Sequence, residues 1–433
     1  MNGLLNAGQR IAVGGLPQRM APLAVSAFTA ACAAGTGVSA LAEGLMAQRS
    51  GLLRLPDMRP TPDWAGPGEP VATWVGLVDA LAALPLPAAL TAWDCRPTRL
   101  AWQALQLDGF IDAVAAARRR WGAARVGLVL GTSASTIGDS EAAYRHLDAD
   151  GGFPASHRNP RLNTPHALAA FVQLALALEG PAVTVSTACS SSAKAFTSAQ
   201  RWLLAGVVDA VVVAGVEALS ASLIHGFRSL GLVSATPCRP FDAQRRGLSI
   251  GEAAAFALVQ REDGQSNDTG LQLLGYGESN DAHHMSAPHP EGLGAEAALN
   301  AALARAGVDA AAVDFVNLHG TASAANDAVE AALVARRYAP QVHACATKGL
   351  TGHAMGAAGL LEAVICLLAL QGRGRAGTAQ TAAADAAFGP VFAQQLRLLP
   401  TPGLAQVAAS HSFGFGGNNC VLLFGTQEGA ARA

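Results

Sequence analysis

The sequence predicts an α/β protein made of two similar halves, and three observations lead to this fold class. Apolar runs rich in β-branched residues alternate with Ala- and Gly-rich helical patterns, as in strand–helix–strand units. Two segments look like counterparts, because each joins a strand to a small-residue helix through a turn with reactive side chains: TVSTACSSSAKAFTSA and HACATKGLTGHAMGAAG. Hydrophobic residues make up 51% of the 433 residues and charged residues only 14%, so much of the chain must be interior.

The first half is predicted over residues 21–270, behind an N-terminal extension at residues 1–20. The apolar segment Met20–Ala34 has the length of a secretory signal, but it leads directly into a helical pattern, which favours a core strand at Leu23–Thr29. The other elements expected here are a helix at Val38–Gln48, a long surface excursion over residues 56–100, a helix at Leu100–Trp121, a strand at Arg125–Leu130, loops around one short helix over residues 138–165, a helix at His166–Leu178, a buried strand at Ala182–Thr187, a helix from about Ser191 to Leu204, and strands at Val208–Val216 and Glu252–Val259.

The second half is predicted over residues 271–426 and repeats this alternation. Its expected elements are a strand at Leu271–Gly275, a helix at Ala295–Ala306, a strand at Val313–Leu318, a helix at Asp327–Tyr338, a strand at His343–Thr347, a helix at Gly356–Leu370, and strands at Val407–His411 and Cys420–Phe424. Two such halves packed together would place a site where their strands end.

Composition and motifs exclude several classes of protein. A formal net charge of −2 gives no global basic field for nucleic acid. The seven cysteines are scattered and form no CxxC pair, which argues against a disulfide framework or a zinc site and fits a reducing cytoplasm. No uncharged apolar run reaches the ~18–20 residues of a membrane span. The sequence also lacks a phosphate loop, and no GxGxxG stands at a strand–helix junction.

Cys189 is the first candidate for chemistry. It lies between a predicted strand and a predicted helix, with the small residues Ala188 and Ser190 beside it. Unpaired N–H groups and the positive end of the helix dipole at such a junction favour the thiolate, which is the nucleophilic form. A buried and inert structural cysteine is the alternative, and this stretch alone does not decide between them.

Three further segments carry candidate residues in the second half. His319 ends a predicted strand in NLHGTASAAND, and Lys348 and His353 stand in KGLTGHAMGAAG. The Gly-rich segment SFGFGGNN can direct a backbone N–H towards a reacting carbonyl and can move to admit a substrate. His319 and His353 differ from most of the eleven histidines because each follows a strand and precedes glycine or other small residues.

These motifs together identify a resemblance that covers residues 21–426. The chain is similar to the β-ketoacyl-[acyl carrier protein] synthases of the thiolase-like superfamily, in the elongating group with a Cys-His-His site. The motifs that carry the resemblance, in the family's order, are TACSSS, RPFDxxRxG over Arg239–Gly247, HGT followed by ND, KxxxGH with GAAG, and FGFGG. The resemblance implies the thiolase fold, in which the two halves form a layered αβαβα architecture.

The resemblance also implies residue roles. Cys189 would be the acylated nucleophile, and His319 and His353 would flank the thioester of the malonyl donor. Lys348 would hold the other site residues in order, and Glu362 would support the site without touching the substrate. The backbone N–H groups of Cys189 and Phe415 would form the oxyanion hole, with the Phe415 ring as a gate. Substrate contacts are expected from Thr321, Phe413, Gly414 and Gly416.

The implied reaction is a decarboxylative Claisen condensation that lengthens an acyl chain on Cys189 by two carbons. It needs no metal and no organic cofactor, because the substrates arrive on the phosphopantetheine of acyl carrier protein. The implied partners are that carrier protein and a second subunit, either identical or a paralogous ketosynthase-like chain, with no nucleic acid and no membrane. Two segments look like those of aryl-polyene or related pigment synthases: LSIGEAAAFAL and DAHHMSAPHPEG.

Two alternatives remain open from the sequence. One is a non-catalytic partner resembling a chain length factor, although such subunits lack the nucleophile. The other is a thiolase acting on coenzyme A thioesters, which needs a second cysteine near the C-terminal glycine loop. Cys420 is near that loop, but its place on an apolar strand favours a core residue. The chain also departs from the family pattern at Arg246, where Asp is usual, and at Ser323, where Thr is usual.

Overall fold

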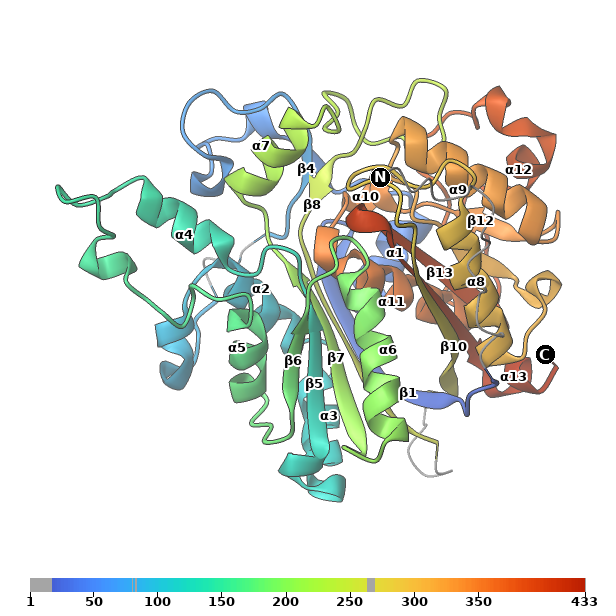
Figure 1. Cartoon of the computed structure of the whole chain (residues 1–433), viewed down its shortest axis with the longest axis horizontal. Helices are drawn as coiled ribbons and strands as arrows, with labels where there is room; N and C mark the ends of the chain where they lie inside the picture. Colours follow the sequence, from blue (N-terminus) through green and yellow to red (C-terminus); the bar gives the residue numbers. More distant parts are fainter. Residues whose placement is uncertain (1–17, 80, 82–83, 263–268, 433) are drawn as a thin grey trace, which may run out of the picture.

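A large sheet runs through the whole molecule (Figure 1). The computed structural model describes residues 18–79, 81, 84–262 and 269–432. Within them the sheet has 11 strands, in the order β12-β11-β13-β14-β10-β1-β9-β7-β5-β6, with β2 (Gly35–Thr36) paired to β1 alone. The main strands are β1 (Leu23–Cys32), β5 (Val126–Gly131), β6 (Ala182–Val185), β7 (Ala210–Glu217), β9 (Ala253–Arg261), β10 (Leu271–Asn280), β11 (Phe315–Asn317), β12 (His343–Cys345), β13 (Val407–Gly414) and β14 (Asn418–Thr426).

The strand order shows an internal duplication. In the first half, β1–β9 and β9–β7 pair antiparallel, whereas β7–β5 and β5–β6 pair parallel. The second half repeats this series, with β10–β14 and β14–β13 antiparallel and β13–β11 and β11–β12 parallel. The strands β6 and β12 of the two counterpart segments therefore occupy equivalent outer positions. This order confirms the prediction of two similar α/β halves.

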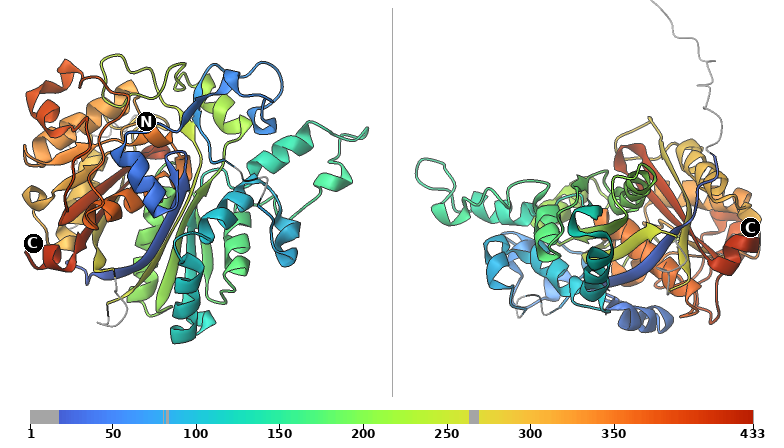
Figure 2. Two further views of the ribbon diagram at one scale, coloured as in Figure 1. Left: turned by 180° about the vertical axis from the view of Figure 1, so that it is seen from behind. Right: turned by 90° about the horizontal axis from the view of Figure 1, so that it is seen from below.

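Helices cover both halves and fill the space between them, which gives the expected αβαβα layers (Figures 1 and 2). The central layer contains α6 (Ser191–Leu204) and α11 (Ala358–Leu370), which share one hydrophobic core. Every residue of α11 is buried, as expected for a helix that is apolar all round. A Cβ at Gly359 would lie 2.7 Å from the Ala193 Cβ, so this glycine permits the close approach of the two helices.

The outer layers each have their own core. On the first half, α2 (Arg96–Leu105), α3 (Phe110–Trp121) and α5 (Ala167–Ala175) pack on β5, β7 and β9. On the second half, α8 (Leu293–Ala306), α9 (Ala324–Arg337) and α12 (Gly389–Gln395) pack on the other sheet face. The remaining helices and strands are α1 (Val38–Met46), β3 (Leu52–Arg54), β4 (Trp74–Gly76), α4 (Ile137–Tyr144), α7 (Ala221–Ser229), β8 (Ile250–Gly251), α10 (Lys348–Thr351) and α13 (Gln427–Arg432).

Three predictions about elements were wrong in part. The helix expected at Leu100–Trp121 is two helices, because Asp108 and Gly109 have positive φ angles of 54° and 69°. Residues 56–100 are not only a surface excursion, since β4 joins β3 and β8 in a small sheet with a core of its own. The strand β6 is only half-buried, because it lies at the edge of the large sheet, whereas all eight residues of β7 are buried between two neighbours.

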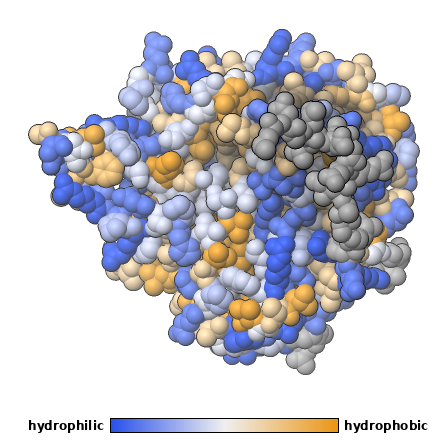
Figure 3. All heavy atoms as spheres, in the orientation of Figure 1, coloured by the Kyte–Doolittle hydropathy of each residue, from blue (hydrophilic) through white to orange (hydrophobic). Residues whose placement is uncertain are grey.

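Other expectations concern the termini, the cysteines and membranes. Residues 1–17 of the expected N-terminal extension lie outside the described residues. All seven cysteines are free, and six of them are buried. On the face shown in Figure 3, hydrophilic and hydrophobic residues are interspersed. Among the described residues, no helix is long and apolar enough to cross a membrane.

Candidate active site

Cys189 lies in a tight turn between β6 and α6. Ala188 has a φ of 52°, in the left-handed region that residues with a Cβ seldom adopt. The side chain of Ser191 fixes this turn, because its Oγ accepts the Thr187 N–H at 2.9 Å and donates to the Ala188 carbonyl at 2.6 Å. A Cβ at Gly414 would lie 3.2 Å from the Cys189 nitrogen, so glycine lets the two loops meet.

The Cys189 sulfur has a histidine and two backbone N–H groups beside it. Sγ lies 3.0 Å from His353 Nε2, and the N–H groups of Phe415 and of Cys189 itself point at the sulfur. Burial nevertheless raises the pKa of the Cys189 thiol to about 11, against the opposing effects of Lys348 and the Phe415 N–H. The expectation that the helix terminus favours a thiolate was therefore wrong for the resting site, because desolvation outweighs the helix N–H groups.

The two histidines face each other across the sulfur. His319 follows β11, and its ring lies 5.4 Å from the His353 ring at an interplanar angle of 85°. Burial and then the Lys348 charge lower the pKa of both imidazoles well below the usual range, so both are neutral. Lys348 Nζ is 3.5 Å from His319 Nδ1. Because an ammonium group only donates, Nδ1 accepts and the His319 proton lies on Nε2.

Lys348 and Glu362 form a buried ion pair behind the histidines. Lys348 Nζ contacts Glu362 Oε1 and also the His319 carbonyl oxygen. Burial raises the pKa of Glu362 to about 7, and the Lys348 charge opposes that rise. The structure thus brings together five residues that the sequence singled out: Cys189, His319, Lys348, His353 and Glu362.

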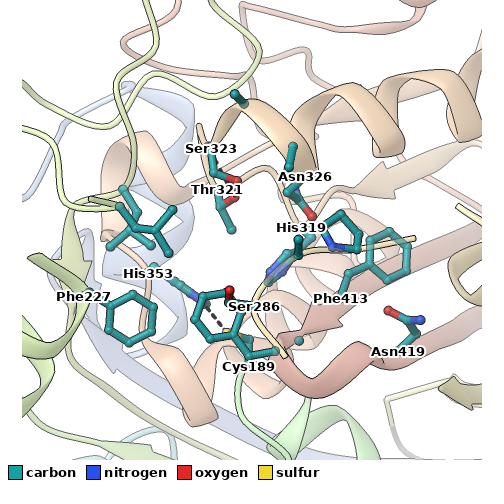
Figure 4. A pocket seen from close by; sticks show the side chains of 18 of the residues that line it. Cys189, Phe227, Ser286, His319, Thr321, Ser323, Asn326, His353, Phe413 and Asn419 are labelled. Atoms are coloured by element: carbon teal, nitrogen blue, oxygen red, sulfur yellow. Dashed lines mark hydrogen bonds between the residues drawn. The ribbon is translucent and has the colours of Figure 1, made fainter. Parts of the chain in front are cut away.

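A cavity of about 260 Å³ opens onto this set. Figure 4 shows Cys189, His319 and His353 converging on it, and Thr321, Phe413 and Gly414 also line it as expected. Gly416, another predicted substrate contact, is not among the lining residues, and its N–H donates instead to the Met285 carbonyl at 2.7 Å. Gly416 therefore helps to hold the loop in place and does not form part of the cavity wall.

Phe415 is held in place by a residue that the sequence did not single out. Its ring stacks on Phe227 of α7, with centroids 5.4 Å apart and an interplanar angle of 22°. The loop is also tied to the neighbouring segment, because the Asp281 N–H donates to the Gly417 carbonyl at 2.9 Å. Phe227 lies in an ordinary helical pattern, so only the folded structure connects it to the site.

Buried carboxylates beneath the His319 turn were also missed. Glu330 accepts the N–H groups of His319 and Gly320, each at 2.8 Å. Asp327 accepts those of Phe241 and Ala322 at 2.7 and 3.1 Å, and burial raises the Asp327 pKa to about 7. Asp327 belonged to the family motif, but no sequence signal showed that these side chains support a backbone turn.

Three residues of the site are also of the types that bind metal ions. One donor atom from each of Cys189, His319 and His353 lies within 4.8 Å of the others, a grouping that could hold a cation such as Zn²⁺. The same grouping has a second use, since a thiol with two neutral imidazoles can accept an acyl group and stabilise an enolate. Cys189 beside two neutral imidazoles is therefore a candidate nucleophile for acyl transfer.

Comparison with known proteins assigns the family. Residues 96–264 match the beta-ketoacyl synthase N-terminal domain and residues 272–380 match the C-terminal domain, so the chain belongs to the β-ketoacyl synthase family. It is 32% identical to nodulation protein E of Rhizobium meliloti, over 70% of this chain and 76% of that protein. It is 30% identical to 3-oxoacyl-[acyl-carrier-protein] synthase 2 of Staphylococcus aureus, over 69% and 77%.

A solved structure supports the same assignment. The chain resembles the complex of a ketosynthase with its chain length factor from Xenorhabdus doucetiae, with a TM-score of 0.79 and 35% identity. The match covers 94% of this chain and 98% of the matched chain. The thiolase-type fold and the condensing class predicted from the sequence are therefore confirmed.

The raised thiol pKa predicts how Cys189 reacts with an alkylating agent. Because the thiolate is the reactive form, the rate of labelling by iodoacetamide should rise about tenfold per pH unit from pH 7 to 9. The measurement is the labelling rate by intact mass, with that of Cys189→Ala subtracted to remove the other cysteines. A rate that is already constant near pH 7 would contradict the predicted burial effect.

The buried ion pair predicts a cost in stability. Lys348→Met should lower the free energy of unfolding by about 3–5 kcal/mol, because it leaves the Glu362 carboxyl buried without its partner. The loss should be smaller at pH 6 than at pH 8, since a protonated carboxyl costs less to bury. Urea denaturation measures both effects.

The other lysine supplies a matched control for this prediction. Lys194 is only partly buried and bonds the Asn418 amide at 3.0 Å, so Lys194→Met should cost less. The double variant Lys348→Met, Glu362→Leu should recover most of the lost stability, because neither charge then remains. Equal costs for the two single lysine variants would argue against a strong buried pair.

Proposed function

We propose that the chain is a β-ketoacyl-[acyl carrier protein] synthase that condenses malonyl carrier with an acyl chain held on Cys189. The observation that carries this proposal is the 3.0 Å contact of Cys189 Sγ with His353 Nε2, with His319 facing the same cavity. A nucleophile and two neutral imidazoles at one place suit both halves of that reaction.

The first half-reaction loads the cysteine. The thiol proton passes to His353 Nε2, and the thiolate attacks the carbonyl carbon of an acyl-carrier thioester. The N–H groups of Phe415 and Cys189 receive the oxyanion that forms. When this intermediate collapses, the carrier sulfur leaves with the bonding electrons and takes the proton from His353. The acyl group then remains on Cys189.

The second half-reaction uses both histidines. The thioester oxygen of malonyl carrier accepts hydrogen bonds from His319 and His353, and cleavage of the carbon–carboxylate bond releases CO₂ and leaves an enolate. Donation from His353 requires its proton on Nε2, and Nδ1 has no hydrogen-bond partner among the described residues. Each such hydrogen-bond donor typically lowers the activation free energy by about 3–4 kcal/mol. The enolate carbon attacks the acyl group on Cys189, and the thiolate leaves.

Two alternatives fit the site less well. A non-catalytic partner subunit would have no use for an assembled Cys189, His319, His353 and Lys348. A thiolase would need a second cysteine in the cavity, but Cys420 is fully buried in β14 and is not among the lining residues. Burial also raises the Cys420 pKa above its usual range.

The proposal includes a carrier protein and a second subunit. The Xenorhabdus doucetiae relative is a ketosynthase in complex with its chain length factor, which supports a paralogous partner here, although an identical partner would serve the same chemistry. The edge strand β6 has one open side and half-buried apolar residues, so we assign the partner to this edge. The segment DAHHMSAPHPEG supports a role in aryl-polyene or related pigment synthesis.

The proposed chemistry also sets requirements on compartment and cofactors. A reducing compartment such as the cytoplasm suits an enzyme whose Cys189 must stay a thiol. No metal or organic cofactor takes part in the proposed steps, so we expect full activity in the presence of a chelator. The growing chain is carried by the phosphopantetheine of the carrier protein.

The experiment that tests the proposal is transfer of an acyl group to the protein. Incubation with acyl-carrier should add one acyl mass to the wild-type chain, on Cys189. Cys189→Ala should keep its folded circular dichroism spectrum, accept no acyl group and form no β-ketoacyl product. An acyl group on another cysteine, or on none, would overturn the assignment of the nucleophile.

The donor distinguishes the proposal from its alternatives. The acylated protein should give product with malonyl carrier but not with acetyl-coenzyme A, because condensation follows decarboxylation. Product from acetyl-coenzyme A would instead indicate a thiolase. Activity that appears only after another ketosynthase chain with its own cysteine is added would indicate a partner subunit.

A further inference from the structure

Three buried side chains behind the site form a hydrogen-bonded chain that the mechanism above does not use. Tyr338 Oη lies 2.8 Å from His411 Nε2, and His411 Nδ1 lies 3.1 Å from Glu330 Oε1. Glu330 in turn accepts the N–H groups of His319 and Gly320, each at 2.8 Å. The chain thus runs from the end of α9 through β13 to the backbone of a candidate catalytic histidine.

The proton positions in this chain follow from burial of the phenol and from which atoms can donate or accept. Burial raises the pKa of Tyr338 above its usual range, so the phenol keeps its proton and donates it to His411 Nε2. A carboxylate oxygen only accepts, so His411 carries a proton on Nδ1, and that N–H donates to Glu330 Oε1. Each donor therefore points towards the Glu330 carboxylate, which is completely buried together with His411.

This arrangement makes the His319 turn depend on His411. Without the His411 N–H, Glu330 would be a buried carboxylate that lacks one donor, and its side chain would have to shift or admit water. Either change would move the two N–H groups that Glu330 holds. Phe413 also connects His411 with His319, because its ring lies 5.2 Å from the His411 ring and 6.2 Å from the His319 ring.

His353 is held by different contacts. Its N–H donates to the Ser249 carbonyl at 2.8 Å, and its carbonyl accepts the Gly251 N–H at 2.9 Å. Neither bond includes Glu330 or His411. The contact of Cys189 with His353 therefore has its own support, and the hydrogen bonds of the buried chain reach the His319 turn and not His353.

We propose that His411, held by Tyr338, is a positioning residue that fixes Glu330 and thereby places His319 for decarboxylation of the malonyl donor. This inference rests on the proposed function. Loading of Cys189 uses His353 and two backbone N–H groups, whereas decarboxylation also needs His319. Loss of His411 should therefore impair the second half-reaction and spare the first.

The test measures the two half-reactions separately in full-length protein. In His411→Phe, a ring of similar size replaces the imidazole and both hydrogen bonds are lost. Decarboxylation of malonyl carrier to acetyl carrier should fall about 10- to 100-fold, the effect of a displaced catalytic group. The rate of acyl transfer to Cys189 should stay within about twofold of wild type. Mass spectrometry of carrier and enzyme follows both rates.

Conservative variants separate positioning from packing. The amide of His411→Gln can accept from Tyr338 and donate to Glu330, so this variant should retain most of the decarboxylation rate. Tyr338→Phe removes only the outer donor and should give a smaller loss in the same half-reaction. Because it keeps the His411 ring, it tests the inference even if His411→Phe does not fold.

A matched control is another buried histidine of the same sheet, two strands away. His343 in β12 bonds the Ala376 carbonyl at 2.7 Å and Thr401 Oγ1 at 3.2 Å, away from Glu330. His343→Phe should affect both half-reactions alike. Equal losses of both half-reactions in the His411 and Tyr338 variants, or a selective loss in His343→Phe, would overturn the inference. Failure of the proposed function would appear in wild type, as absence of both half-reactions.

Discussion

The Lys348 ammonium group is the interaction on which the arrangement of the site depends. Its Nζ contacts the Glu362 carboxylate, the His319 carbonyl and, at 3.5 Å, His319 Nδ1. Its charge adds to burial in keeping the imidazoles of His319 and His353 neutral. A neutral imidazole can donate an N–H hydrogen bond to an oxygen that gains negative charge. It keeps its proton, so it need not be reprotonated in each cycle. Lys348 does not line the cavity, so it sets the state of the donors without competing for the substrate.

The internal duplication explains how distant segments reach one place. In each half the outermost strand of the sheet is parallel to its neighbour and ends in a turn that carries reactive residues. In the first half this strand is β6, which leads to Cys189, and in the second half it is β12, which leads to Lys348 and then His353. The central helices α6 and α11 follow these turns and pack on each other. One half therefore supplies the proposed nucleophile, and the other supplies the histidines that we propose act on the malonyl donor.

The sequence was sufficient for the fold class and for three residues that meet at the cavity, because strands, helices and short motifs can be recognised from neighbouring residues alone. Strands and helices alternate visibly, and Cys189, His319 and His353 stand in short motifs at strand ends. The protonation states could not be predicted in this way. The raised pKa of the Cys189 thiol comes from desolvation by segments far away in the sequence, which outweighs the local helix terminus. The partners Glu330 and His411 are likewise 81 residues apart and meet only in the fold.

In the proposed reaction, the position of Phe415 links substrate access to stabilisation of the oxyanion. Its ring stacks on Phe227, while its own backbone N–H points at the Cys189 sulfur. A loop that swings away to admit a substrate carries this N–H with it, so the oxyanion donor pair is complete only when the loop has closed again. Gly416 and Gly417 have φ angles of 72° and 70°, and glycine adopts such angles without strain. In the proposed reaction the closed loop also excludes water from the enolate, which a proton would otherwise quench before it reached the acyl group. The burial that raises the thiol pKa is therefore the same condition that protects the carbon nucleophile.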